Sequence, residues 1–337
     1  MTRYLLIALL IFSVGCDNFR WPDRRRGRGD RRRNNTFGLA KNANDPVEFW
    51  QPKSRIFLQS AVSQYSTGLR DFDSDIEASR LVLVEAGHLL QEFASPRDVI
   101  DSPRERHLCQ NILFVQATVF AETNHTDEAF HALQAAERFG FADVERLKNA
   151  KSLASLQNDD RMKQLVERIS VKEPAETMLC VESAFRGLPK APFPISMIRK
   201  SDQMVLTTTD LESCNVLFMV GSWNPPCREM LPILEKAKEE FESEGVRFWI
   251  LGIDAEPRHR DLPTVLDSLR KQDSPIEVLV GERRLFSEFR EVADFPATLL
   301  IDNNAKIIAL LTGYHSIDAL RGVVHTATSQ VSKAPSY

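Results

Sequence analysis

Apolar residues recur at two different spacings along the chain, and the change of spacing divides it into two regions. Between residues 45 and 170 they recur three or four positions apart, as in Leu81, Val84 and Leu89, which predicts amphipathic helices. Pro103 marks one helix start, because proline is favoured at the first helical position. The expected helices cover residues 52–68, 74–95, 103–122, 126–139, 143–156 and 159–170.

Beyond residue 192, short apolar runs alternate with amphipathic segments, which is typical of a sheet covered by helices. The predicted strands cover residues 193–198, 203–207, 215–221, 246–253, 276–280, 297–302 and 306–312. The predicted helices cover residues 225–244, 259–272, 284–291 and 316–329. Between the two regions, residues 171–192 contain three prolines and lack clear periodicity, so we expect an interdomain linker there.

The N-terminus has the pattern of an export signal. An apolar run from Tyr4 to Val14 follows a short basic start and ends at Gly15 and Cys16. The run is too short to span a bilayer comfortably, which favours a cleaved signal over a transmembrane helix. It resembles a bacterial lipoprotein signal, which implies removal of residues 1–15, lipidation at Cys16 and a periplasm-facing place in the cell envelope. An ordinary cleaved signal and an uncleaved anchor are the alternatives.

A basic segment follows the signal. Residues 17–36 contain eight Arg and three Asp and have almost nothing to bury, so we expect residues 16–44 to be an anchor and a disordered tether. Beside a lipid anchor, such a segment attracts anionic headgroups. A solvated spacer is the alternative. The rest of the chain is acidic, and the export signal argues against an RNA-binding role for the Arg-rich run, so no nucleic-acid partner is expected.

Cysteine and histidine spacing predicts no metal centre. Apart from Cys16, the chain has four widely separated cysteines, and its seven histidines show no pair at a ligand spacing. We therefore predict no metal site and no cofactor. The only candidate thiol in a recognisable motif is Cys227.

One helical stretch carries a repeat pattern. Across residues 107–170, small and large side chains stand where a tetratricopeptide repeat packs its paired helices, namely Ala117, Phe120, Ala129, Leu133 and Ala136. Asn124 occupies the place of that repeat's usual turn glycine. The segment thus resembles one tetratricopeptide repeat followed by a degenerate partner. A generic helical bundle is the alternative.

The strongest motif lies between a buried apolar strand and an amphipathic helix. It reads Trp-Asn-Pro-Pro-Cys-Arg-Glu and covers residues 223–229. It resembles the Trp-Cys-x-x-Cys turn of thioredoxin-fold oxidoreductases, with Asn224 in place of the attacking cysteine and Cys227 in place of the resolving one. In that chemistry the first thiolate attacks a disulfide and the second thiol resolves the mixed disulfide. Asn224 cannot attack, but it is a good helix N-cap.

Further local matches extend this resemblance over residues 193–330, which are similar to the TlpA/ResA-like branch of the thioredoxin superfamily. Pro232 matches the family's helix-kinking proline, and Phe295 with Pro296 matches its cis-proline strand. The resemblance implies that Phe295 and Pro296 border Trp223 and Cys227 and form a substrate-binding groove. A trans proline at a strand edge is the alternative.

Together these patterns predict an all-α, tetratricopeptide-like domain over residues 45–170 and an α/β thioredoxin fold over 193–330, with a tail at 331–337. Two functions stay open. In one, a protein of thiol-disulfide oxidoreductase ancestry keeps a redox role through Cys227. In the other, a catalytically inactive, lipid-anchored adaptor holds clients through its helical repeats and the cis-proline groove. The expected partners are envelope proteins or cysteine-containing peptides.

Overall fold

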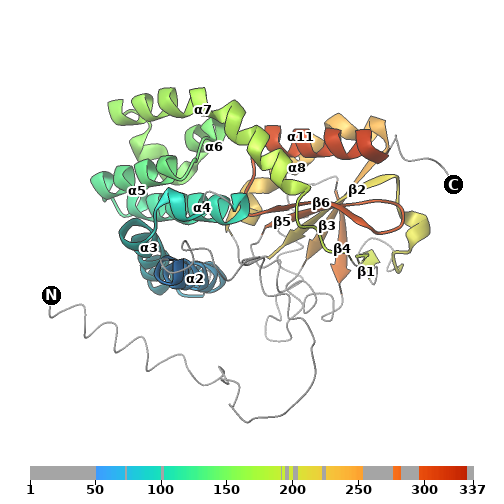
Figure 1. Cartoon of the computed structure of the whole chain (residues 1–337), viewed down its shortest axis with the longest axis horizontal. Helices are drawn as coiled ribbons and strands as arrows, with labels where there is room; N and C mark the ends of the chain where they lie inside the picture. The colour runs from blue at the N-terminus through green and yellow to red at the C-terminus, as the bar shows by residue number, and fades with distance from the viewer. Residues whose placement is uncertain are drawn as a thin grey trace, which may run out of the picture. The chain divides into compact units, whose positions relative to one another are not determined.

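The computed structural model describes residues 51–331, except 73, 100–101, 191, 194–196, 200–203, 222–224, 253–275 and 282–295. The described residues belong to one compact unit, in which helices precede a mixed sheet (Figure 1). The predicted signal, the lipidation site and the Arg-rich tether lie outside the described residues. So do the helices expected over residues 259–272 and 284–291.

The first part of the described chain is largely helical, as the three-four periodicity predicted. Helix α2 packs against α3, α3 against α4, and α4 against α5. Short 3-10 turns cover Pro96–Val99 and Lys151–Leu156. The α-helices are α2 (Gln51–Arg70), α3 (Ile76–Phe93), α4 (Pro103–Glu122), α5 (Thr126–Arg138), α6 (Val144–Asn149) and α7 (Asp160–Ala184).

Local signals explain where α4 begins and ends. The Ser102 side chain accepts a hydrogen bond from the backbone N–H of Glu105, and Pro103 occupies the first helical position. After α4, Asn124 adopts a left-handed backbone with φ of 61°. Asn tolerates this conformation better than other non-glycine residues, so it serves where a turn glycine would otherwise stand.

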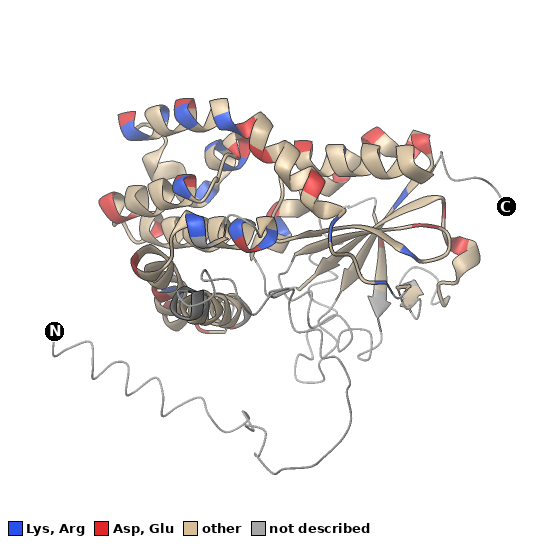
Figure 2. Ribbon diagram, in the orientation of Figure 1, with Lys and Arg blue, Asp and Glu red and all other residues tan. Residues whose placement is uncertain are grey.

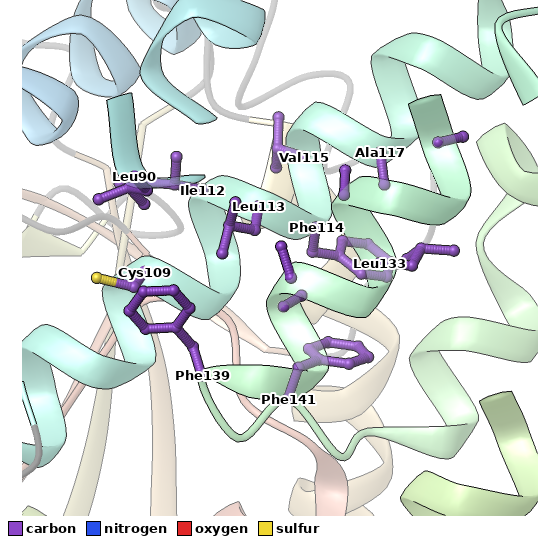
Figure 3. Packing of buried hydrophobic residues seen from close by; sticks show 14 of the residues in the cluster. Leu90, Cys109, Ile112, Leu113, Phe114, Val115, Ala117, Leu133, Phe139 and Phe141 are labelled. Carbon is purple, nitrogen blue, oxygen red and sulfur yellow. The ribbon is translucent and has the colours of Figure 1, made fainter. Parts of the chain in front are cut away.

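The helical core is built around α4, which contributes Ile112, Leu113 and Phe114 with almost no exposed surface. Leu133 of α5 and Phe141 of the following turn belong to the same cluster, and Figure 3 shows them on the side of Phe114. The rings of Phe114 and Phe141 stack with centroids 5.0 Å apart. Burial of these large side chains, each contributing about 2 kcal/mol, explains why the helices pack as a layer.

Helix α7 corrects the sequence-based expectation of an irregular segment after residue 170. It continues through Pro174 to Ala184, so much of the expected linker is helical. Its first half places Ile169 in the helical core, and its second half places Ala184 in the core beside the sheet. Burial at both ends offsets the hydrogen bond that Pro174 cannot donate.

The second part is a six-stranded sheet in the order β1-β4-β3-β2-β5-β6. The three strands β2, β3 and β4 are parallel, whereas β5 runs antiparallel to β2 and β6 antiparallel to β5. Of the strand expected over residues 203–207, the described residues 204–207 form only an isolated bridge, between Val205 and Ile198. The strands are β1 (Met197–Arg199), β2 (Cys214–Val220), β3 (Val246–Gly252), β4 (Glu277–Gly281), β5 (Ala297–Ile301) and β6 (Ile307–Thr312).

Both faces of the central strand β2 are buried. Val216 and Phe218 face one core, where helices α8 (Pro225–Phe241) and α11 (Ile317–Val331) cover the sheet, while Leu217 faces the other. Strands β2, β5 and β6 carry no charged residue, and the charges in Figure 2 lie mainly on helices. This arrangement is a thioredoxin fold, preceded by the largely helical region.

Candidate functional site

The predicted active-site turn connects β2 with α8. Strand β2 ends at Val220, and α8 begins at Pro225 after three residues that lie outside the described part. Trp223 and Asn224 belong to those three, and Phe295 lies in another such segment. The roles of Trp223, Asn224 and Phe295 therefore stay predictions, whereas the structure describes Cys227 and Pro296.

Cys227 lies in the first turn of α8 and faces inward. Its exposed fraction is 3%, and it packs with Met230 and Leu231 in the core between α8 and the sheet. A thiol in this position is shielded from large substrates in solution, because reactive cysteines are at least partly exposed. Cys227 has the place expected of the resolving cysteine, and its burial is the ordinary fate of a small apolar side chain.

Pro296 lies immediately before β5 and is buried. Ala297 pairs with Met219, so the antiparallel register brings Pro296 opposite Val220, at the end of β2 that leads into the turn. The Pro296 carbonyl accepts a hydrogen bond from the Gly313 N–H at 2.7 Å. The sheet thus brings Pro296 to the same end as the start of α8. The groove that the resemblance implies between Pro296, Trp223 and Cys227 stays a prediction.

A second polar cluster, which the sequence analysis missed, lies where the helical region meets the thioredoxin fold. It surrounds a recess of about 80 Å³, which we call the interdomain recess. Residues of α4, α6, α7 and the turn after β6 line it, among them His107, Asn111, Arg146, Cys180 and His315. The one sequence signal was a group of polar residues inside the otherwise apolar helix α4.

Two histidines stack at the base of this cluster. The rings of His107 and His315 have centroids 4.3 Å apart and an interplanar angle of 8°. His107 Nε2 lies 2.6 Å from the Tyr314 carbonyl, and its Nδ1 lies 3.2 Å from Gln110 Oε1. Burial lowers the pKa of His107 to about 4 and that of His315 well below its usual range. Both imidazoles are therefore neutral at pH 7.

Cys180 contacts His315, with its Sγ 3.3 Å from Nδ1. Burial raises the pKa of the Cys180 thiol to about 12, so the pair consists of a neutral thiol and a neutral imidazole. This thiol is a weak nucleophile, because only the thiolate attacks disulfides. The pair therefore does not replace the cysteine that position 224 lacks.

Arg146 joins the two regions. Its Nε and Nη2 donate to Glu229 Oε2 at 3.2 and 3.1 Å, and its Nη1 donates to Asn111 Oδ1 at 2.8 Å. The guanidinium carbon lies 4.1 Å from the ring centroid of Phe114 and 3.8 Å from that of Tyr314. Glu229 is on α8, two residues after Cys227, so this ion pair connects the helical region to the helix of the predicted turn.

A Redoxin family profile matches residues 190–323. No curated protein matches the chain. The chain is also similar to three solved structures. A thio-disulfide isomerase from Thermus thermophilus has 23% identity and a TM-score of 0.35, and the match covers 42% of this chain and 96% of that one. A thiol:disulfide interchange protein, thioredoxin family protein, from Chlorobium tepidum TLS has 19% identity and a TM-score of 0.34 over 42% of this chain and 99% of that one. StoA from Bacillus subtilis has 16% identity and a TM-score of 0.34 over 40% of this chain and 97% of that one.

The C-terminal part is a thioredoxin-like domain, and its residues 190–323 match the Redoxin profile. Among the described residues, no group of three His, Cys, Asp or Glu side chains is arranged to hold a metal ion. Within the same part of the chain, no helix is both long and apolar enough to cross a bilayer.

Proposed function

We propose that this protein is an adaptor that uses a thioredoxin-like domain to bind a partner and no longer carries out dithiol exchange. The observation that carries the proposal is the burial of Cys227, whose exposed fraction is 3%, in a motif whose attacking position is Asn224. Exchange needs an accessible thiolate to attack and a second thiol to resolve the mixed disulfide. Cys227 is buried and supplies no accessible attacking thiolate, and with Asn at position 224 the motif has no pair of thiols.

The binding role is supported by what the motif keeps. Trp223 and Phe295 would supply an apolar rim, and the backbone before Pro296 would offer strand-like hydrogen bonds to an extended peptide. The tetratricopeptide-like pattern of the helices favours a second contact with the same client. Envelope proteins and cysteine-containing peptides are the clients we expect.

Anchoring completes the proposal. Cys16, at the end of the apolar N-terminal run, would carry lipid, and the Arg-rich tether would lie against anionic headgroups of the bacterial envelope. Both features support a position of the two domains at the periplasmic side of a membrane. The proposed adaptor therefore meets its clients at that surface.

Reduction of insulin disulfides by the wild type and by the Asn224→Cys variant tests the loss of exchange. We expect wild type to be inactive and Asn224→Cys to gain activity by several orders of magnitude, because the substitution restores Cys-x-x-Cys. The matched control is Asn224→Cys with Cys227→Ser, which lacks the resolving thiol and should release product slowly. Reduction by wild type at the rate of the Asn224→Cys variant would contradict the proposal.

A further inference from the structure

Arg146 is held in place by the helical region itself. Its backbone N–H donates to Asp143 Oδ1 at 2.7 Å at the start of α6, and its side chain is 3% exposed. Within the same region, Asn111 accepts from Nη1, and the ring of Phe114 lies under the guanidinium. A planar guanidinium with these contacts has little rotational freedom, so it presents a fixed pair of N–H groups to α8.

Glu229 receives that pair of N–H groups near the start of α8. The carboxylate is partly solvated, with 40% of its side chain exposed, whereas the guanidinium is buried. An unpaired buried charge is unfavourable, so the contact resists separation of α8 from Arg146. Cys227 precedes Glu229 by two residues in the same helix, so a shift of α8 that separates Glu229 from Arg146 also moves the thiol.

The other end of α8 has a different kind of ion pair. Arg321 of α11 donates through Nε to Glu240 at 2.7 Å, and these side chains are 35% and 34% exposed. Arg321 and Glu240 both lie within the thioredoxin fold, and solvent screens their attraction. This pair joins α8 to α11, and both of its residues belong to the thioredoxin fold, so it serves as a matched control.

From these contacts we infer that Arg146 is a positioning residue for the Cys227 turn: the helical region holds the first turns of α8 through Glu229 and thereby keeps Cys227 packed. The inference deepens the proposed adaptor function and rests on it. It assigns the helical region a regulatory role, because a partner that displaces α6 would loosen α8 and expose the turn. Neither half of the contact lies in the segments outside the described part.

Alkylation of the reduced, full-length chain with iodoacetamide tests this inference, with each cysteine-containing peptide quantified by mass spectrometry. The variants are Glu229→Gln and Arg146→Lys, and the control is Arg321→Met. Glu229→Gln keeps the side-chain shape, and Arg146→Lys keeps the charge but loses the forked donor. Cys109 in the helical core and Cys214 in β2 are both 0% exposed, so their labelling in the same sample reports global unfolding.

We expect both variants to label Cys227 at least about tenfold faster than wild type, with Cys109 and Cys214 unchanged and Arg321→Met like wild type. Should either variant be unstable, acceleration measured relative to Cys214 still distinguishes local release from unfolding. Equal acceleration at Cys109, Cys214 and Cys227, or no acceleration at Cys227, would overturn the inference. Neither result bears on insulin reduction, so the adaptor proposal and this inference can fail separately.

Discussion

Gly313 offers a quantitative test of how closely the helical region approaches the sheet. It follows β6, has φ of +78°, and lies where a Cβ would be 2.6 Å from Asn111 Nδ2. Asn111 cannot easily move away, because its Oδ1 accepts from buried Arg146. Gly313→Ala therefore adds a left-handed backbone cost of about 1–2 kcal/mol and an overpacking cost of about 1–3 kcal/mol.

Gly245 is the matched control. It has nearly the same backbone, with φ of +77°, but nothing lies within 4 Å of the position that a Cβ would occupy. Gly245→Ala should therefore lower the free energy of unfolding only by the left-handed backbone cost, about 1–2 kcal/mol. The free energy of unfolding, measured by urea titration of each full-length variant, should fall further for Gly313→Ala by about 1–3 kcal/mol.

A double-mutant cycle identifies the contact responsible. With Asn111→Ala in the background, a Cβ at position 313 has room, so Gly313→Ala should cost little more than Gly245→Ala does. Two results would refute the reasoning. One is an equal loss of stability for Gly313→Ala and Gly245→Ala, and the other is an additive cycle, because either would mean that Asn111 does not crowd position 313.

Acid should weaken the fold through the stacked histidines. The pKa of His107 is about 4 in the folded state, below the ordinary value of 6.5 that applies in the unfolded chain. The free energy of unfolding should therefore be highest above pH 6.5 and should fall by about 3 kcal/mol as the pH drops towards 4. His107→Gln should flatten that loss in urea titrations. Burial raises the pKa of Asp143 to about 6, so protonation of this carboxyl stabilises the folded state as the pH falls below 6. Asp143→Asn removes that gain and should make the stability fall more steeply with decreasing pH. Asn124→Val, at φ of 61°, should lower the thermal midpoint, while Asn124→Gly should not. Cys16→Ser should move the chain from the membrane fraction to the soluble fraction, and unchanged fractionation would contradict lipidation.

Much of the fold could be predicted from the spacing of apolar residues and from residues that start and cap helices. The expected helix over residues 103–122 coincides with α4, because Ser102 caps it and Pro103 starts it. The strand expected over residues 215–221 corresponds to β2 with a shift of one residue. In these elements local propensity and burial favour the same structure, so a single sequence is sufficient.

Helix α7 shows where such reasoning fails. Pro174 and weak periodicity suggested a linker, yet the helix continues to Ala184 because its two halves bury residues in two different cores. A helix that packs against two different cores has no single apolar face along its length, so its apolar residues show no clear helical spacing. The Arg146–Glu229 pair was hidden for a related reason: the two residues are 83 positions apart, and only the packed structure brings them together.

The contact between the helical region and the thioredoxin fold is polar, and this gives a physical basis for a movement of one region to affect the other. An apolar interface tolerates small shifts, whereas a buried charged network keeps its stability only while each donor faces its acceptor. Asn111 Nδ2 and His315 Nε2 already lack a hydrogen-bond partner among the described residues. A partner that draws α6 away would break the Arg146–Glu229 contact and would also pull Leu147 out of the helical core. Within the thioredoxin fold, the consequence would begin in α8, in the turn that carries Cys227.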